Sequence, residues 1–186
     1  AIVSGIEQGI YATVSAADQF IIESDLTEHS FVCDMDTALL REKANEGGYY
    51  SYVAGVASYM NEYYSVGGRR IHITKQTLPI KSGLSSSAAI CVLAARAFNQ
   101  VYKLRISIVG EMQIAFYGEQ RTPSRCGRLD QACAYGVKPV HMVFDGNEIE
   151  TRPLKIAKPL YWAIADLKAS KDTVKILSDL NKCYPF

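Results

Sequence analysis

The chain has 186 residues, of which 48% are hydrophobic and 21% are charged, a composition typical of a globular protein rather than a disordered one. Its 20 lysines and arginines almost balance its 19 acidic residues, and the net charge of +1 argues against nucleic acid or an anionic membrane as the main partner. No apolar run approaches the roughly 18 residues of a membrane-spanning helix, and the first residues show no secretion signal. We therefore expect one cytoplasmic domain.

The five cysteines are odd in number, widely spaced and never arranged as C-x-x-C, so the sequence predicts neither a disulfide framework nor a zinc site. The three histidines are equally scattered and lack the spacing of paired metal ligands. We expect reduced thiols, which agrees with a cytoplasmic protein.

The first half of the chain shows three short strand patterns, a helix and a further strand. The runs Gly9–Ser15, Phe20–Ser24 and Phe31–Cys33 are typical of strands, and we expect them to form an antiparallel set. Helical spacing predicts a helix over Tyr49–Tyr64, whose tyrosines favour packing over a stacking platform for a ligand. Alternating apolar and polar residues predict a half-buried strand over Arg69–Thr77.

The most informative stretch follows that strand. Residues Leu78–Ala89 are rich in serine, glycine and alanine, and they lead into an apolar helix over Ile90–Tyr102. A helix N-terminus presents unpaired N–H groups and the positive end of the helix dipole, so a loop of small residues there can cradle a phosphate. The residues alone leave open an ordinary capped helix start, with three serines where one would do.

Two better-known loops do not fit this stretch. No lysine follows Gly83, as the P-loop pattern G-x-x-x-x-G-K-[ST] requires. The residue two positions after Ser85 is Ser87, where the nucleophile elbow G-x-S-x-G has glycine. A serine hydrolase is therefore disfavoured.

A pair of carboxylates comes next. Helical spacing predicts a helix over Ser107–Gln120, in which Glu119 continues the apolar face near the C-terminus. Burial and the helix dipole both oppose a negative charge there unless a cation compensates it. That cation could be a metal, or a salt-bridge partner among Arg121, Arg125 and Arg128. Asp130 follows, and on its own it could simply cap a short helix.

The last part of the chain shows strand patterns over Val140–Phe144, Glu148–Arg152 and Leu160–Leu167. After them, Lys171-Asp172-Thr173 opens a predicted helix. Its inward-facing residues are expected to be Val174, Leu177 and Leu180.

The loop and the second carboxylate carry a resemblance to a known family. Pro79–Ala89 resembles the second conserved motif of the GHMP kinases, the small-molecule kinases named for galactokinase, homoserine, mevalonate and phosphomevalonate kinases. Its Gly-Leu-Ser-Ser-Ser-Ala-Ala form is closest to the sugar kinases. Gly127–Gly136 resembles the family's Gly-x-x-Asp segment, and Asp130 followed by Gln131 is again most similar to the galactokinase-like members.

The resemblance implies ATP and Mg²⁺ as cofactors and assigns roles to residues of this chain. The loop around the nucleotide would comprise Pro79, Ser82, Gly83, Leu84, Ser85, Ser86, Ser87 and Ala88. Ser86 or Ser87 would bind Mg²⁺ together with Glu119, and Asp130 would be the catalytic residue that faces the acceptor hydroxyl. Lys171 is a weaker candidate for a phosphate contact.

The implied reaction is the phosphorylation of a hydroxyl on a small molecule, most closely the anomeric hydroxyl of a monosaccharide. A mevalonate-like or other non-sugar kinase is the alternative enzyme. A ligand sensor of the same fold without turnover is the alternative of another class. The intact serines and carboxylates argue against the sensor, since a sensor needs no base.

The resemblance also implies the fold. We expect an α+β domain with a mixed, largely antiparallel sheet and helices packed on it, the ribosomal protein S5 domain 2-like fold of GHMP kinase N-terminal domains. The family's first motif and its glycine-rich third motif have no counterpart in this sequence. Residues 1–186 therefore look like the N-terminal, ATP-binding domain of a longer kinase.

Overall fold

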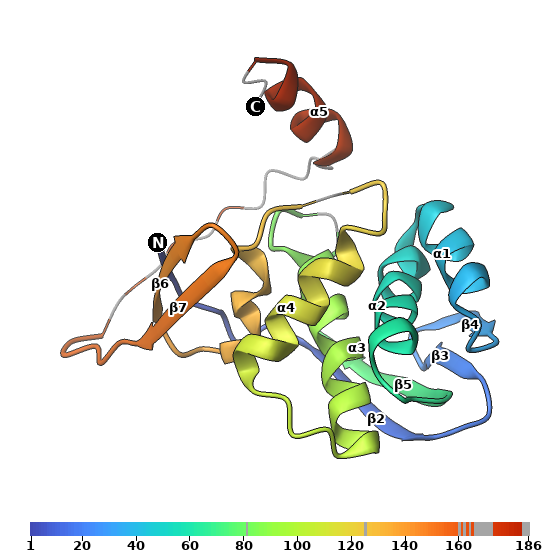
Figure 1. The fold of residues 1–186 in the computed structure, drawn as a ribbon. Coiled ribbons are helices and arrows are strands. Elements are labelled where there is room, and N and C mark those ends of the chain that lie inside the picture. The colour runs from blue at the N-terminus through green and yellow to red at the C-terminus, as the bar shows by residue number, and fades with distance from the viewer. Residues whose placement is uncertain are drawn as a thin grey trace.

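The computed structural model describes residues 1–80, 82–124, 126–159, 161, 163, 165 and 173–183. Within this part of the chain the strands form two sheets rather than the single sheet expected (Figure 1). The larger sheet has the strand order β2 (Ile10–Ala16), β5 (Arg69–Gln76), β3 (Phe20–Ser24) and β4 (Thr27–Cys33). The smaller sheet has the order β1 (Ile2–Val3), β6 (Val140–Asp145) and β7 (Glu148–Pro153).

Strand β5 lies inside the larger sheet. It pairs antiparallel with β2 and parallel with β3, while β3 and β4 form an antiparallel pair. The predicted antiparallel set is therefore right for β3 with β4 and wrong for β2 with β3, because β5 is inserted between them. A parallel pair needs a long crossover connection, and here β4 and two helices provide it.

The helices of the described residues follow the predicted pattern with two differences. Helix α3 begins at Ser86 rather than Ile90, because two of the loop serines belong to its first turn. Helix α1 has no counterpart among the predicted elements, although Asp36 caps it by accepting a hydrogen bond from the Leu39 N–H at 2.8 Å. The helices are α1 (Thr37–Asn45), α2 (Tyr49–Tyr63), α3 (Ser86–Tyr102), α4 (Ile108–Glu119), the 3₁₀ helix η1 (Asp130–Tyr135) and α5 (Thr173–Cys183).

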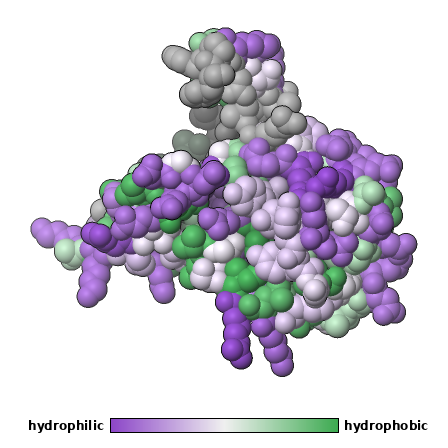
Figure 2. Space-filling view, in the orientation of Figure 1, coloured by the Kyte–Doolittle hydropathy of each residue, from purple (hydrophilic) through white to green (hydrophobic). Residues whose placement is uncertain are grey.

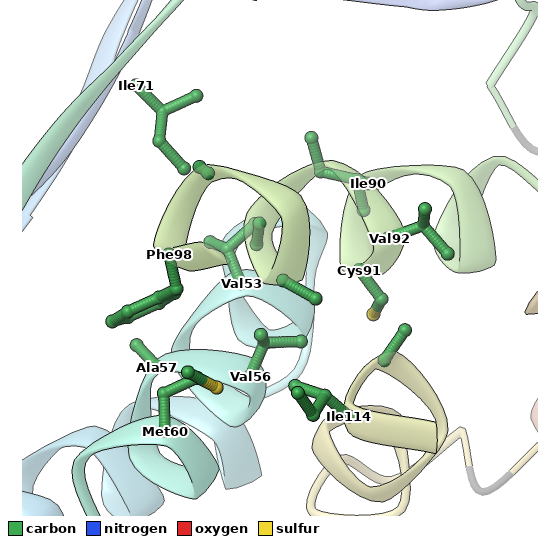
Figure 3. Packing of buried hydrophobic residues seen from close by; sticks show 14 of the residues in the cluster. Val53, Val56, Ala57, Met60, Ile71, Ile90, Cys91, Val92, Phe98 and Ile114 are labelled. Carbon is green, nitrogen blue, oxygen red and sulfur yellow. The ribbon is translucent and has the colours of Figure 1, made fainter. Parts of the chain in front are cut away.

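Helix α3 is the central helix of the core. Figure 3 shows Ile71 of β5 on one side of α3, and Val56 and Met60 of α2 with Ile114 of α4 on the other. All four side chains are at most 3% exposed. Packing on both sides holds α3 in place, so its N-terminus is a well-fixed position for a binding site.

The end of the chain departs from its prediction. Leu180 of α5 is expected to face inward but is 51% exposed, and α5 lies apart from both sheets (Figure 1). Most of the predicted strand over 160–167, together with Lys171 and the side chains of Val174 and Leu177, lies outside the described residues.

The surface facing the viewer in Figure 2 is mostly polar. Apolar side chains form small separate groups on it, one of them near the connection between α3 and α4. None of the helices in the described residues is long and apolar enough to cross a bilayer.

Candidate active site

The loop between β5 and α3 enters the helix through left-handed backbone. Gly83 has a φ of +81° and Ser85 a φ of +55°. Ser85 occupies the N-cap position of α3, but its side chain makes no capping hydrogen bond. A capping serine has extended backbone and accepts a hydrogen bond from the first turn. The interpretation as an ordinary capped helix start is therefore wrong, and the Ser85 side chain leaves the first N–H groups of α3 uncapped.

A cavity of about 980 Å³ opens beside this loop. Gly83, Ser85, Ser86 and Ser87 line it, and Asp130 lines it as well. The structure thus brings together the predicted loop and the predicted catalytic carboxylate from segments far apart in the sequence. The remaining predicted loop residues do not line the cavity: Pro79 and Ser82 are exposed, Leu84 is half-buried and Ala88 is buried.

Glu119 is the last residue of α4 and is fully buried. Its Oε2 accepts a hydrogen bond from Nε2 of Gln131 at 3.0 Å, whereas its Oε1 has no hydrogen-bond partner in the described part of the chain. An ionised carboxylate with one oxygen buried and unpaired is costly unless a cation binds it or it takes up a proton. Glu119 is therefore a candidate ligand for a cation.

Two of the three arginines that could have formed a salt bridge with Glu119 bind other groups instead. Arg121 bonds to Glu62 at 2.7 Å and to Ser58 at 2.6 Å. Arg128 donates to the Gly146 carbonyl and to the Asn147 side chain. Arg125 lies outside the described residues.

Some groups around Glu119 raise its pKa and others lower it. Burial raises the pKa of Glu119, and the neighbouring Cys126 thiol, Ser87 hydroxyl and Gln131 amide oppose that rise. The charge of Asp130 adds to the rise. Ser87, one of the two serines proposed for the metal, therefore has its hydroxyl beside the carboxylate.

Asp130 is exposed to the cavity and is the first residue of η1. The N-cap position of η1 belongs to Leu129, and no side chain caps this helix. The interpretation of Asp130 as a helix cap is therefore wrong. Arg96 fixes the other end of η1, since its Nη2 donates to the Ala134 carbonyl at 3.0 Å.

Tyrosines from the first turn of α2 line another part of the cavity. The ring of Tyr50 stacks on Phe31 with centroids 5.6 Å apart, and its hydroxyl donates to the His29 carbonyl at 2.7 Å. Burial raises the pKa of Tyr49 to about 12. This neutral aromatic wall suits a flat, apolar ring of a ligand.

Sequence reasoning missed Gln131 and Cys126 as parts of the site. Gln131 is fully buried, and its Nε2 contacts both Glu119 and the Cys126 sulfur. No local pattern in the sequence marks either residue, because both contacts depend on tertiary packing.

Comparison with known proteins agrees with this arrangement. Residues 51–137 match the family described as the GHMP kinases N terminal domain. This stretch, just under half of the chain, is therefore similar to a GHMP kinase N-terminal domain. The matched residues run from α2 to just beyond η1, so they include the loop serines, Glu119 and Asp130. The predicted family is confirmed.

Individual relatives are GHMP-type kinases of different substrates. The galactokinase of Thermotoga maritima is 29% identical over 161 residues, covering 81% of this chain and 42% of that protein. The 4-diphosphocytidyl-2-C-methyl-D-erythritol kinase of Limosilactobacillus reuteri is 30% identical over 122 residues, covering 65% and 38%. The chain therefore spans less than half the length of these relatives.

The GHMP fold is also seen in solved structures. The galactose complex of Lactococcus lactis galactokinase superimposes with a TM-score of 0.64 at 20% identity, covering 88% of this chain and 46% of that one. At this identity the likeness shows the fold. The predicted α+β class, with a mixed and largely antiparallel arrangement of strands, is confirmed.

Proposed function

We propose that this chain is the nucleotide-binding part of an ATP- and Mg²⁺-dependent kinase that phosphorylates a hydroxyl of a monosaccharide. The observation that carries the proposal is the buried, unpaired Oε1 of Glu119, beside the Ser87 hydroxyl and behind a cavity that Asp130 also lines. Phosphoryl transfer needs phosphates held in position, their charge neutralised, and a group that orients the acceptor hydroxyl.

The phosphates would lie at the N-terminus of α3. The left-handed backbone at Gly83 and Ser85 turns the chain so that small side chains surround this helix end. The helix dipole and the N–H groups of the first turn, which the Ser85 side chain does not cap, favour a negative group there. The serines that line the cavity can donate further hydrogen bonds.

Glu119 and Ser87 would hold Mg²⁺ together with the phosphates. Within the described residues, no three His, Cys, Asp or Glu side chains gather as a ready metal cage. This fits Mg²⁺, which proteins bind through one or two carboxylates plus substrate phosphates rather than through an all-protein shell. When bound, the ion neutralises charge on the transferred group.

Asp130 would orient the acceptor hydroxyl and accept its proton. Its exposed position on the cavity wall leaves the carboxylate accessible to a substrate. Nearby Glu119 differs in being fully buried. The two carboxylates thus have different environments, as distinct roles require.

The aromatic wall at Tyr49 and Tyr50 would bind the nucleotide base.

The choice of a sugar rests on the galactokinase relatives and on the sequence of the loop. The alternative is a non-sugar kinase, which the 4-diphosphocytidyl-2-C-methyl-D-erythritol kinase of Limosilactobacillus reuteri favours at a similar identity. The five cysteines are free, which agrees with a cytoplasmic enzyme.

The test is a kinase assay on the full-length protein with a panel of monosaccharides, mevalonate and homoserine, with thermal unfolding measured with and without MgATP. A native-state ligand raises the melting temperature. The proposal expects this rise and turnover with a sugar. Turnover with a non-sugar alone would favour the alternative kinase, and sugar binding without turnover would favour the sensor. No shift at millimolar MgATP would remove the phosphate-loop assignment.

A further inference from the structure

Gln131 is a fully buried glutamine that no role described above requires. Its Nε2 donates to Glu119 Oε2 at 3.0 Å and contacts the Cys126 sulfur at 3.2 Å. The two N–H groups of the amide are thus both engaged. The reverse orientation of the amide would set its carbonyl oxygen against the carboxylate, so the side chain has one favourable orientation.

That orientation leaves one oxygen of each of the two hydrogen-bonded side chains without a partner. Glu119 Oε1 and Gln131 Oε1 both lack a hydrogen-bond partner in the described chain. When Glu119 is ionised both oxygens are acceptors, so neither can satisfy the other. Buried acceptors need donors or a cation, and a hydrated divalent ion offers both at once.

We propose that Gln131 is a positioning residue for the metal-binding carboxylate, an inference that rests on the proposed function. Its Nε2 holds Glu119 Oε2, which leaves Oε1 as the oxygen that binds the cation. Its own Oε1 accepts a hydrogen bond from a water molecule of that cation. Outer groups of this kind orient metal ligands in many proteins, and their loss typically weakens metal binding about 10- to 100-fold.

The position of Gln131 in η1 adds a second consequence. It directly follows Asp130, which lies exposed on the cavity wall while Gln131 points into the core. The same short helix therefore carries the proposed base and the group that orients the metal ligand. Arg96 holds this helix through the Ala134 carbonyl, so both groups share one fixed support.

The test uses Gln131→Met in the full-length protein, because methionine keeps the length of the side chain and removes both the donor and the acceptor. Mn²⁺ serves as the probe, and its binding to the ADP complex is followed by electron paramagnetic resonance. We expect the Mn²⁺ dissociation constant to rise about 10- to 100-fold, while ADP affinity without divalent ions stays unchanged.

Ser58→Ala is the matched control. Ser58 is also fully buried and accepts a hydrogen bond, in this case from Arg121 at 2.6 Å. Its loss should cost stability and leave the Mn²⁺ constant as in the wild type. Normal Mn²⁺ binding by a folded Gln131→Met variant would overturn the inference and leave a structural role only.

Gln131→Glu provides a second variant if methionine prevents folding. It places a second carboxylate beside Glu119, so the metal-free protein should melt at a lower temperature than the wild type. Mn²⁺ should then raise the melting temperature of the variant by more than it raises that of the wild type. A gain no larger than that of the wild type would contradict the inference. If the wild-type protein itself fails to bind Mn²⁺ with ADP, the proposed function fails and this inference fails with it.

Discussion

Gly118 of α4 lies against the backbone of Val56 in α2. A β-carbon on Gly118 would be 2.5 Å from Val56 Cγ2 and 2.7 Å from its Cα, and one on Gly55 would collide with the Gly118 carbonyl. The two helices thus meet with their backbones in contact, which only glycine permits. Glu119 follows Gly118 directly, so this close approach also sets how deeply its carboxylate is buried.

We expect Gly118→Ala to lower the free energy of unfolding by about 1–3 kcal/mol, because the added methyl meets backbone that cannot move aside easily. It should also raise the Mg²⁺ concentration needed for activity, since α4 must shift and carry Glu119 with it. Denaturant unfolding and a Mg²⁺ titration of the full-length protein measure the two effects. Gly127→Ala is the stability control, because a β-carbon there meets nothing within 4 Å. Equal stability of the two variants would show that the helix contact can relax.

The periodicity of the sequence predicts α2 and α4 to within one residue at each end. It does not predict that β5 is inserted between β2 and β3. That order depends on pairs such as Ile22 with Ile71, which local patterns do not contain. Helix α1 was missed because its capping residue precedes a segment with only Leu40 and Ala44 buried, too few apolar positions to give a clear helical stripe.

The buried carboxyl of Glu119 makes a pH-dependent contribution to stability. Its pKa is raised, chiefly by burial, so the native state retains a proton that the unfolded chain has lost. Stability of the metal-free protein should therefore fall as pH rises from the ordinary glutamate pKa to the raised one. In Glu119→Gln this fall should be absent, because the amide is neutral at every pH. Melting temperatures across this range in the presence of a chelator measure the difference.

A carboxylate with the opposite shift provides the control. Although burial alone would raise it, hydrogen bonds from Arg121 and Arg41 hold the pKa of Glu62 below its ordinary value. Glu62→Gln should therefore remove stability that is present above the ordinary glutamate pKa and lost as pH falls. If Glu119→Gln follows the wild-type pH profile, the buried carboxyl does not titrate in this window. Saturating MgATP should flatten the wild-type profile, because a cation then compensates the charge.

The Ser87 hydroxyl is one of the groups that lower the pKa of Glu119, which makes Ser87 the stronger of the two serine candidates for the metal. We expect Ser87→Ala to raise the Mg²⁺ concentration for half-maximal activity by at least about tenfold, the size typical of a lost group around a metal. Ser86→Ala should change it less and mainly weaken ATP binding. Titrations of Mg²⁺ at fixed ATP, and of ATP at fixed Mg²⁺, separate the two effects. The reverse order of effects would assign the metal to Ser86.

The sequence predicts the proposed metal-binding and catalytic residues, but it does not predict the residue that positions them. Ser86 or Ser87, Glu119 and Asp130 could be named because the sequence resembles the GHMP kinases, whose motifs assign roles to these positions. Gln131 could not, because its place beside Glu119 follows from how η1 packs between α3 and α4. Such contacts depend on tertiary packing, which the order of residues along the chain does not express.

Asp130 separates the kinase from a ligand sensor. Asp130→Asn keeps the shape of the side chain, and since Asp130 caps no helix, the variant should be as stable as the wild type to within about 1 kcal/mol. If Asp130 takes the proton from the substrate hydroxyl that is phosphorylated, kcat of the variant should fall by roughly 10²–10⁴-fold. ATP affinity should stay unchanged, because the loop and the N-terminus of α3 are untouched. Turnover and ATP binding are measured on the same full-length variant with saturating sugar.

Asp145→Asn is the matched control for this substitution, since Asp145 is an exposed carboxylate at the end of β6, outside the cavity lining. It should leave turnover unchanged, which excludes a general effect of losing one surface charge. Wild-type turnover in Asp130→Asn would show that another group handles the proton. A decrease in kcat together with weaker ATP binding would instead indicate that Asp130 supports the nucleotide site. Only a loss of kcat at constant ATP affinity fits a group that acts on the acceptor hydroxyl.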